Sequence, residues 1–138
     1  MVGEVKIQVI FTLNELLKNK LMIYLEILVE SFEKKKDSIF FTFFKHFIRF
    51  LNLEANPEYE GQFNLVAYWL LEFNDENSVP TREIGLDIEK KAIILLPLEK
   101  NYGYWTDNNL VFGDFCSLFK NCKITKEYFV SKWEKFPK

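Results

Sequence analysis

Four acidic residues could supply a general acid and a general base: Glu72, Glu83, Asp87 and Asp107. Such catalysis needs two carboxyl groups close to the same reacting bond. Glu83 and Asp87 share one face of a predicted strand, but strand rise separates them by about 13 Å. That spacing is wide for a catalytic pair, and it favours a solvated acidic face with Arg82 available for a cross-strand ion pair. We therefore predict that this protein is not an enzyme.

The other reactive side chains also lack a catalytic or metal-binding pattern. His46, the single histidine, falls on the polar arc of a predicted helix, with no Ser or Cys at a motif spacing. Cys116 and Cys122 are six positions apart, unlike metal-ligand pairs, and we expect Cys116 to pack as a small apolar residue. The five glycines are scattered, so no phosphate-binding loop is predicted. The sequence thus indicates no cofactor and no metal.

Acidic residues are concentrated in the middle third of the chain. Residues 54–89 hold nine acidic residues and one basic residue, a net charge of −8 in a chain whose net charge is −2. We expect these carboxylates to gather on one outward patch, which would steer a basic protein partner and argues against nucleic acid. The predicted partner-binding acids are Glu58, Glu60, Glu72, Asp75, Glu76, Glu83 and Asp87.

Residues 101–109 mix turn-forming Asn, Gly and Asp with three large aromatic side chains. Turn residues favour a loop, while Tyr and Trp suit recognition surfaces. One interpretation is a loop that contacts a partner or ligand through Tyr102, Tyr104, Trp105 and Asp107. The other is a loop whose Trp105 and Tyr102 fold back to close the end of the sheet. Both hold if one ring lies in the core and another lies outside.

The N-terminal third is predicted to supply a strand and helices. Residues 3–11 alternate as a half-buried strand does, and Thr12-x-x-Glu15 reads as a capping box that opens a helix. Residues 22–30 fit either the continuation of that helix, which we favour, or a strand with Ile23, Leu25, Ile27 and Val29 facing inward. Residues 39–52 form a second helix whose wide Phe-rich arc could also serve a homodimer.

A two-residue period replaces the helical one after the acidic linker 53–62. A first strand is expected at 65–73, a second one after the turn 74–80, and a third one at 91–98 after a turn at Glu89-Lys90. Together the three strands form an antiparallel meander. Asp114 and Thr125 can each start a helix, the second with Phe129, Val130, Trp133 and Phe136 as its apolar stripe. The prediction is an α+β fold, with N-terminal helices and a C-terminal helix packed on an antiparallel β-meander.

Length and composition favour one domain over residues 1–138, with a strand and helices at 1–53, the sheet at 62–112 and helices at 114–136. Apolar residues make up 49% of the 138 residues and aromatic residues 17%, which is ample for a core. No segment is apolar enough to span a bilayer, and the N-terminus lacks the order of a signal peptide. We expect a soluble, cytoplasmic protein with no membrane partner.

Several short motifs in the C-terminal half resemble a known class of bacterial proteins. They are Tyr68-Trp69-x-x-Glu72-Phe73, Arg82-Glu83-Ile84-Gly85-Leu86-Asp87, Pro97, Asn101-Tyr102-Gly103-Tyr104-Trp105-Thr106-Asp107, Asp114-Phe115, and the helix with Phe129 and Trp133. This stretch, about residues 65–136, resembles small uncharacterised bacterial proteins that we associate with the immunity partners of polymorphic toxins. The resemblance implies neutralisation of a toxin by tight binding, without catalysis, and it carries over no catalytic residues.

Three functional hypotheses follow from these patterns. The first is a non-catalytic immunity-type protein that binds a basic toxin, or another cationic partner, through the acidic surface and the aromatic loop. The second is a small-ligand site or enzyme with a pocket lined by Tyr68, Trp69, Tyr104 and Trp105, with Asp107 or Glu72 as its polar group. The third is a homodimerising structural subunit that uses the Phe-rich helix.

Overall fold

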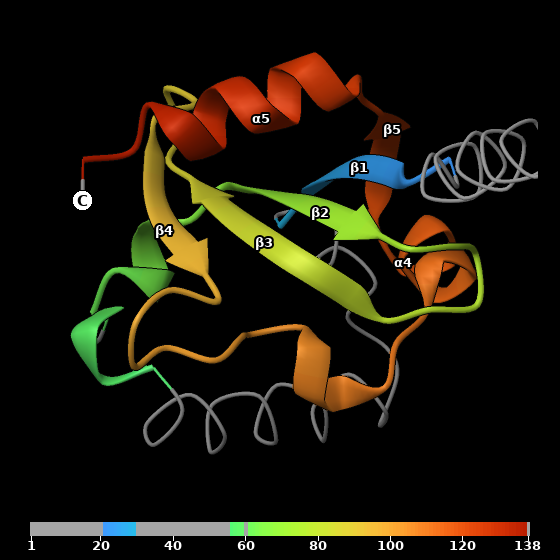
Figure 1. Ribbon diagram of the computed structural model, residues 1–138, viewed down its shortest axis with the longest axis horizontal. Helices are drawn as coiled ribbons and strands as arrows, with labels where there is room; N and C mark the ends of the chain where they lie inside the picture. The colour runs from blue at the N-terminus through green and yellow to red at the C-terminus, as the bar shows by residue number, and fades with distance from the viewer. Residues whose placement is uncertain (1–20, 30–55, 60, 138) are drawn as a thin grey trace, which may run out of the picture.

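The computed structural model describes residues 21–29, 56–59 and 61–137, which form an α+β fold around a five-stranded antiparallel sheet (Figure 1). The strands are β1 (Ile23–Leu28), β2 (Tyr68–Phe73), β3 (Pro80–Leu86), β4 (Ala92–Leu96) and β5 (Lys120–Lys123), and their order across the sheet is β4-β3-β2-β1-β5. The helices are α4 (Phe112–Leu118) and α5 (Lys126–Glu134). Three 3-10 turns complete the fold: η1 (Pro57–Tyr59), η2 (Phe63–Leu65) and η3 (Thr106–Asn108).

The centre of the sheet is the predicted meander of β2, β3 and β4. Each strand pairs antiparallel with the next, and the register sets Glu72 opposite Arg82 and Glu83 opposite Leu96. Lys90 has a φ of 61° in the turn between β3 and β4, where Glu89-Lys90 was expected to reverse the chain. The two-residue period therefore predicts these three strands correctly, because each strand buries side chains on alternating faces.

The favoured helix at residues 22–30 is wrong, and the rival strand is correct. β1 pairs antiparallel with β2 along its whole length, from Ile23 opposite Phe73 to Leu28 opposite Tyr68. Leu25 and Ile27 are fully buried on one face, while Tyr24 and Glu26 are buried on the other. A helix pattern and a doubly buried strand look alike in a short apolar run, and only the pairing with β2 decides between them.

β5 is a strand that the sequence patterns did not predict. It pairs antiparallel with β1 at the edge of the sheet, and all four of its residues are exposed. A short, lysine-containing edge strand shows almost no alternation of apolar and polar residues, so the two-residue period does not identify it as a strand.

Cys116, in the neighbouring α4, is also exposed. The expectation that Cys116 packs as a small apolar residue is therefore wrong, because α4 turns Phe112 and Phe115 inward instead.

Both faces of the sheet are covered, which explains why its strands are apolar on both sides. We call the face under α5 the α5 face and the opposite one the loop face. Figure 1 shows α5 lying across the first, while α4 and the connection from β4 lie towards the second. The α5 face buries Tyr24, Leu70, Ile84, Leu86 and Leu95 around Phe129. The loop face buries Leu25, Ile27, Trp69, Leu71, Phe73, Ile94 and Leu96.

The two C-terminal helices begin close to the predicted positions. Asp114 accepts a hydrogen bond from the Val111 N–H (2.9 Å) in the first turn of α4. The Thr125 hydroxyl caps α5 by accepting from the Tyr128 N–H (3.2 Å), as its sequence position predicts. Phe129 is fully buried, and Trp133 and Phe136 pack against the same cluster. The C-terminal helix of the prediction is thus confirmed.

Several predictions lie outside the described residues. They are the strand at 3–11, the helix that opens at Thr12, and the Phe-rich helix at 39–52 with His46. Glu54 and Glu60 of the acidic segment also lie outside. In the described part of the chain, no helix has both the length and the apolar character needed to cross a membrane.

Candidate functional site

The aromatic loop that follows β4 folds back onto the loop face of the sheet. Trp105 is only 3% exposed and packs among the side chains of the loop face. Its indole meets the Trp69 ring edge-on, with centroids 6.2 Å apart. Tyr104 stacks on both Trp69 and Phe63, each at a centroid distance of 5.0 Å. Trp105 therefore follows the fold-back interpretation of residues 101–109.

Glu83 holds this loop in place from the middle of β3. Its carboxylate is 1% exposed and accepts four hydrogen bonds. The Tyr104 N–H donates to Oε2 (2.8 Å), while the N–H groups of Trp105 and Thr106 (both 2.9 Å) and the Thr106 hydroxyl (2.7 Å) donate to Oε1. Burial raises the pKa of Glu83 to about 7, and the four donors oppose that rise. The Glu83 carboxylate thus accepts the backbone N–H groups of the loop, as the carbonyl groups of a neighbouring strand would.

Asn56 fixes the loop from a second direction. Its side-chain amide donates to the Gly103 carbonyl (2.7 Å) and accepts from the Gly103 N–H (3.2 Å). Asn56 is 1% exposed, so both bonds are shielded from water. A Cβ at position 103 would come within 2.8 Å of the Thr106 hydroxyl oxygen. Only glycine fits there, because the chain doubles back tightly around the Glu83 carboxylate.

Asn101 forms a third attachment, one residue before the exposed Tyr102. The Asn101 amide donates to Glu58 Oε2 (2.9 Å) and to the Leu98 carbonyl (3.1 Å), and its oxygen accepts from the Glu58 N–H (3.3 Å). Asn101 is 1% exposed, whereas Tyr102 is 73% exposed. A large aromatic side chain therefore points outward from a backbone that is anchored on both sides. This contrast is the clearest candidate for a binding feature.

Tyr102 corrects one detail of the predicted loop. The fold-back interpretation paired Tyr102 with Trp105 in the core, but Tyr102 lies outside and Tyr104 takes the half-buried position. The combined interpretation, with one ring in the core and another at the surface, describes the loop correctly. Asp107 lies within η3.

The acidic residues of the middle third do not form one outward patch. Glu72 (3% exposed) and Glu83 (1% exposed) are buried on opposite faces of the sheet. Asp75 and Glu76 lie in the turn between β2 and β3, whereas Asp87 lies in the turn at the other end of β3. A seven-residue strand separates the two turns by about 20 Å. The expected patch is wrong because strand alternation and the hairpin turns disperse the carboxylates.

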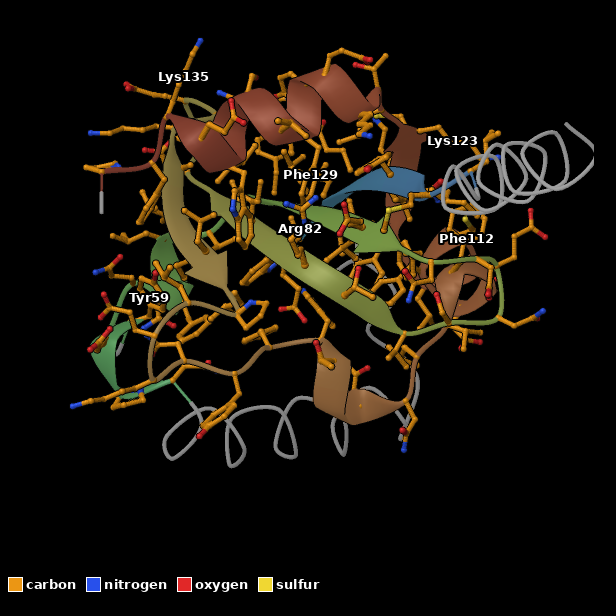
Figure 2. All side chains as sticks on the ribbon, viewed as in Figure 1. Tyr59, Arg82, Phe112, Lys123, Phe129 and Lys135 are labelled. Atoms are coloured by element: carbon orange, nitrogen blue, oxygen red, sulfur yellow. The ribbon has the colours of Figure 1, made fainter. Side chains whose placement is uncertain are left out.

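Glu72 is matched by Arg82 across the two central strands, as the sequence predicted for Arg82. The guanidinium Nε donates to Oε1 (2.7 Å), Nη2 donates to Oε2, and the Thr81 hydroxyl adds a third bond (3.1 Å). Burial opposes ionisation of Glu72, but the bonds from Arg82 prevail and lower its pKa. In Figure 2 Arg82 lies beneath Phe129 of α5, whose ring centroid is 5.1 Å from its guanidinium carbon. Glu72 is therefore part of the core.

Lys90 and Lys91, which directly follow the acidic segment, lie in the same turn between β3 and β4 as Asp87 and Glu89. Lys90 pairs with Glu26 of β1 (2.7 Å) and lies over the Tyr68 ring at 4.6 Å. The carboxylate of Asp87 accepts the N–H groups of Glu89 and Lys91 (both 2.9 Å), so it stabilises its own turn. Glu58, Glu76 and Glu89 remain exposed. Of these, only Glu58 is tied to the aromatic loop.

The predicted pocket of four aromatic residues is not formed. Tyr68 and Trp69 are neighbours in β2 and lie on opposite faces of the sheet, so they cannot line the same cavity. Trp69, Tyr104 and Trp105 fill the space between them with their own rings. A groove of about 490 Å³ lies instead beside β1 and β5, lined by Leu21, Met22, Ile23, Tyr24, Lys123, Ile124 and Lys126. Within the described ranges, no cluster of residues could hold a metal ion.

Sequence reasoning missed the residues that hold the loop. Asn56 was read as part of a linker, and Glu83 was assigned to a solvated face. The register shows why Glu83 is not solvated: on the β3 face that also carries Gly85, its neighbours on both adjacent strands are the apolar Leu71 and Leu96. A carboxylate at such a position needs donors from elsewhere in the chain. The turn-rich segment 101–109 is where those donors are found.

Comparison with protein-family models, with curated proteins and with solved structures gives no match for this chain.

Proposed function

We propose that this chain is a non-catalytic protein-binding protein of the immunity type. It neutralises a basic toxin, or another cationic partner, by binding it at the aromatic loop. The single observation that carries the proposal is the 73% exposure of Tyr102 between two buried, hydrogen-bonded neighbours, Asn101 and Gly103. Exposed tyrosines on rigid backbones are frequent binding hot spots, because little conformational entropy is lost when they are covered.

Glu58 supports a cationic partner for this surface. Its exposed side chain is oriented by Asn101, the residue that precedes Tyr102. An aromatic face and a carboxylate anchored to the same short segment suit a lysine or arginine side chain, which can ion-pair with one and stack on the other. Two acids of the middle third are removed from the surface by burial. The remaining acids still outnumber the bases of residues 54–89, so long-range steering of a basic protein is retained.

The proposal predicts that Tyr102→Ala weakens binding to the cognate partner at least about tenfold, since buried aromatic anchors dominate such interfaces. The measurement is titration calorimetry with the purified product of the neighbouring gene, the first candidate for a toxin. Ile88→Ala is the matched control, because Ile88 is also 73% exposed but lies in the turn between β3 and β4. Absence of binding by the unmodified chain, or equal losses for both variants, would contradict the proposal.

Glu58→Gln separates steering from anchoring in the same experiment. Removing one exposed charge should lower the association rate and reduce its dependence on salt, with a smaller rise in the dissociation rate than Tyr102→Ala causes. An unchanged salt dependence would argue against a cationic partner, even if Tyr102 proves to be essential.

A further inference from the structure

The two outer strands of the sheet, β4 and β5, differ in what lies along their open edges. On β4 the Leu95 N–H donates to the hydroxyl of Tyr59 (3.4 Å), a buried residue of η1, so η1 occupies that edge. All four residues of β5 are exposed, and Figure 1 shows β5 at the rim of the sheet, beyond β1. β5 is therefore the edge that a strand from outside can reach.

The pairing of β5 with β1 determines which of its backbone groups point away from the sheet. The Ile124 N–H donates to the Tyr24 carbonyl (3.0 Å), which continues the register that sets Lys123 opposite Leu25. Hydrogen-bonded and non-hydrogen-bonded pairs alternate along an antiparallel ladder. Lys123 and Asn121 therefore hold the positions whose N–H and C=O groups point outward, and no described residue bonds to those groups.

The charge along this edge is positive. Residues 119–126 contain three exposed lysines, Lys120, Lys123 and Lys126, and no acidic residue. Lys123 lies over the Phe112 ring at 5.5 Å, and Figure 2 shows it at this side of the molecule. Lysines on an edge strand oppose pairing with a second copy of the same strand, because like charges would meet. The same lysines attract a strand that carries carboxylates.

An apolar groove adjoins the same edge. It is the groove of about 490 Å³ beside β1 and β5, to which Lys123, Ile124 and Lys126 contribute. Leu21, on its β1 side, is 89% exposed, and an exposed apolar surface of this kind is typical of binding sites. The groove has room for one large apolar side chain beside the two lysines.

We propose that the outer edge of β5 is a β-augmentation site for an extended, acidic segment of another protein. The backbone of that segment pairs with the outward groups of Asn121 and Lys123, its carboxylates pair with the lysines, and an apolar side chain at its end enters the groove. This site goes beyond the proposed function, which uses Tyr102 in the loop that follows β4.

The test uses a synthetic peptide of alternating Glu and Val that ends in Leu, blocked at both termini, with the full chain. We expect saturable binding, with NMR amide shift changes concentrated in residues 119–126. The same peptide with Lys in place of Glu should not bind, because the edge would repel it. Lys135→Gln, which removes an exposed lysine at the C-terminal end of α5, is the control and should leave the affinity unchanged.

Two substitutions at Lys123 separate charge from backbone pairing. Lys123→Gln removes only the charge and should weaken binding about threefold. Lys123→Pro also removes the outward N–H, so the loss should reach about tenfold or more. Proline is tolerated in an edge strand where its nitrogen faces away from the sheet. If Lys123→Pro does not fold, the unmodified chain is tested with a peptide N-methylated at the backbone nitrogens that face β5, which should not bind.

The opposite results would overturn the augmentation site. They are no binding of the acidic peptide, shift changes outside β5 and the groove, equal losses for Lys123→Gln and Lys123→Pro, or undiminished binding of the N-methylated peptide. A homodimer paired through β5 in sedimentation would also overturn it, since a second copy would then occupy the edge. Tyr102 and its partner take no part in this experiment, so its result is independent of the proposed function.

Discussion

At the scale of single residues, β2 and β3 bury two carboxylates in different ways. Glu72, on the α5 face, is matched by a guanidinium. Glu83, on the loop face, is matched by backbone N–H groups and a hydroxyl. The first arrangement neutralises the charge inside the core, so the pKa of Glu72 is lowered despite burial. The second leaves the charge uncompensated by a cation, and the pKa of Glu83 is raised by burial.

This difference predicts a large cost for removing Arg82. Arg82→Met leaves the Glu72 carboxylate buried without its cation, which should lower the free energy of unfolding by about 2 kcal/mol. This loss is smaller than the loss expected for a fully buried ion pair, because the Arg82 side chain is 32% exposed. Urea denaturation at neutral pH measures it.

Arg82→Lys is the control, because it keeps the charge and loses the two-pronged geometry. Its loss should be smaller than that of Arg82→Met. The double variant Glu72→Gln/Arg82→Met should recover part of the stability, since no charge is then left unpaired. If the double variant is no more stable than Arg82→Met alone, ion pairing is not what Arg82 contributes.

At the scale of elements, α5 is the layer that shields the ion pair and the α5 face from water. Phe129 contacts Tyr24 at a centroid distance of 5.2 Å and lies against the Arg82 guanidinium. The first turn of α5 is held by the Thr125 hydroxyl, which accepts a hydrogen bond from the Tyr128 N–H. Phe129 and the Thr125 cap therefore both contribute to holding this nine-residue helix in place.

Thr125→Ala should lower the free energy of unfolding by about 1 kcal/mol, because the N–H groups of the first turn lose their acceptor. Thermal or urea denaturation measures the loss. Thr125→Ser keeps the hydroxyl and should behave like the unmodified chain. Equal stability of the Ala and Ser variants would show that the cap does not hold α5.

At the scale of the whole molecule, the two buried carboxylates make stability depend on pH in opposite directions. Folded Glu72 binds a proton less tightly than unfolded Glu72, so its contribution is lost only as pH falls below the ordinary value of 4.5. Folded Glu83 binds a proton more tightly than unfolded Glu83. Between pH 4.5 and about pH 7 unfolding therefore releases the Glu83 proton, and stability falls as pH rises.

We therefore expect the free energy of unfolding to decrease as pH rises through that window, because the cost of burying the Glu83 charge exceeds the stabilisation by its four hydrogen bonds. Urea denaturation across the window measures the decrease. Asp87→Asn should retain it, and Glu83→Gln should lack it. A Glu83→Gln variant with the same pH dependence as the unmodified chain would assign the effect to another group.

The sequence by itself determined the meander and the C-terminal helix. Periods of two in β2 to β4 and the Thr125 cap before the Phe129 stripe are local patterns, which need no knowledge of distant residues. The pairing of Arg82 across the strands could be predicted for the same reason, since Arg82 and Glu72 are joined by one short hairpin.

Only the tertiary structure decided what depends on residues far apart in the chain. β1 is a strand because β2, more than 40 residues later, pairs with it. Glu83 is buried because the loop at 104–106 supplies its donors, and Asn56 is structural because Gly103 comes back to it. Charge density along a sequence does not state which face each side chain occupies. For that reason the acidic segment predicted a patch, whereas the described residues present Tyr102 on an anchored loop and the Glu58 carboxylate hydrogen-bonded to the preceding Asn101.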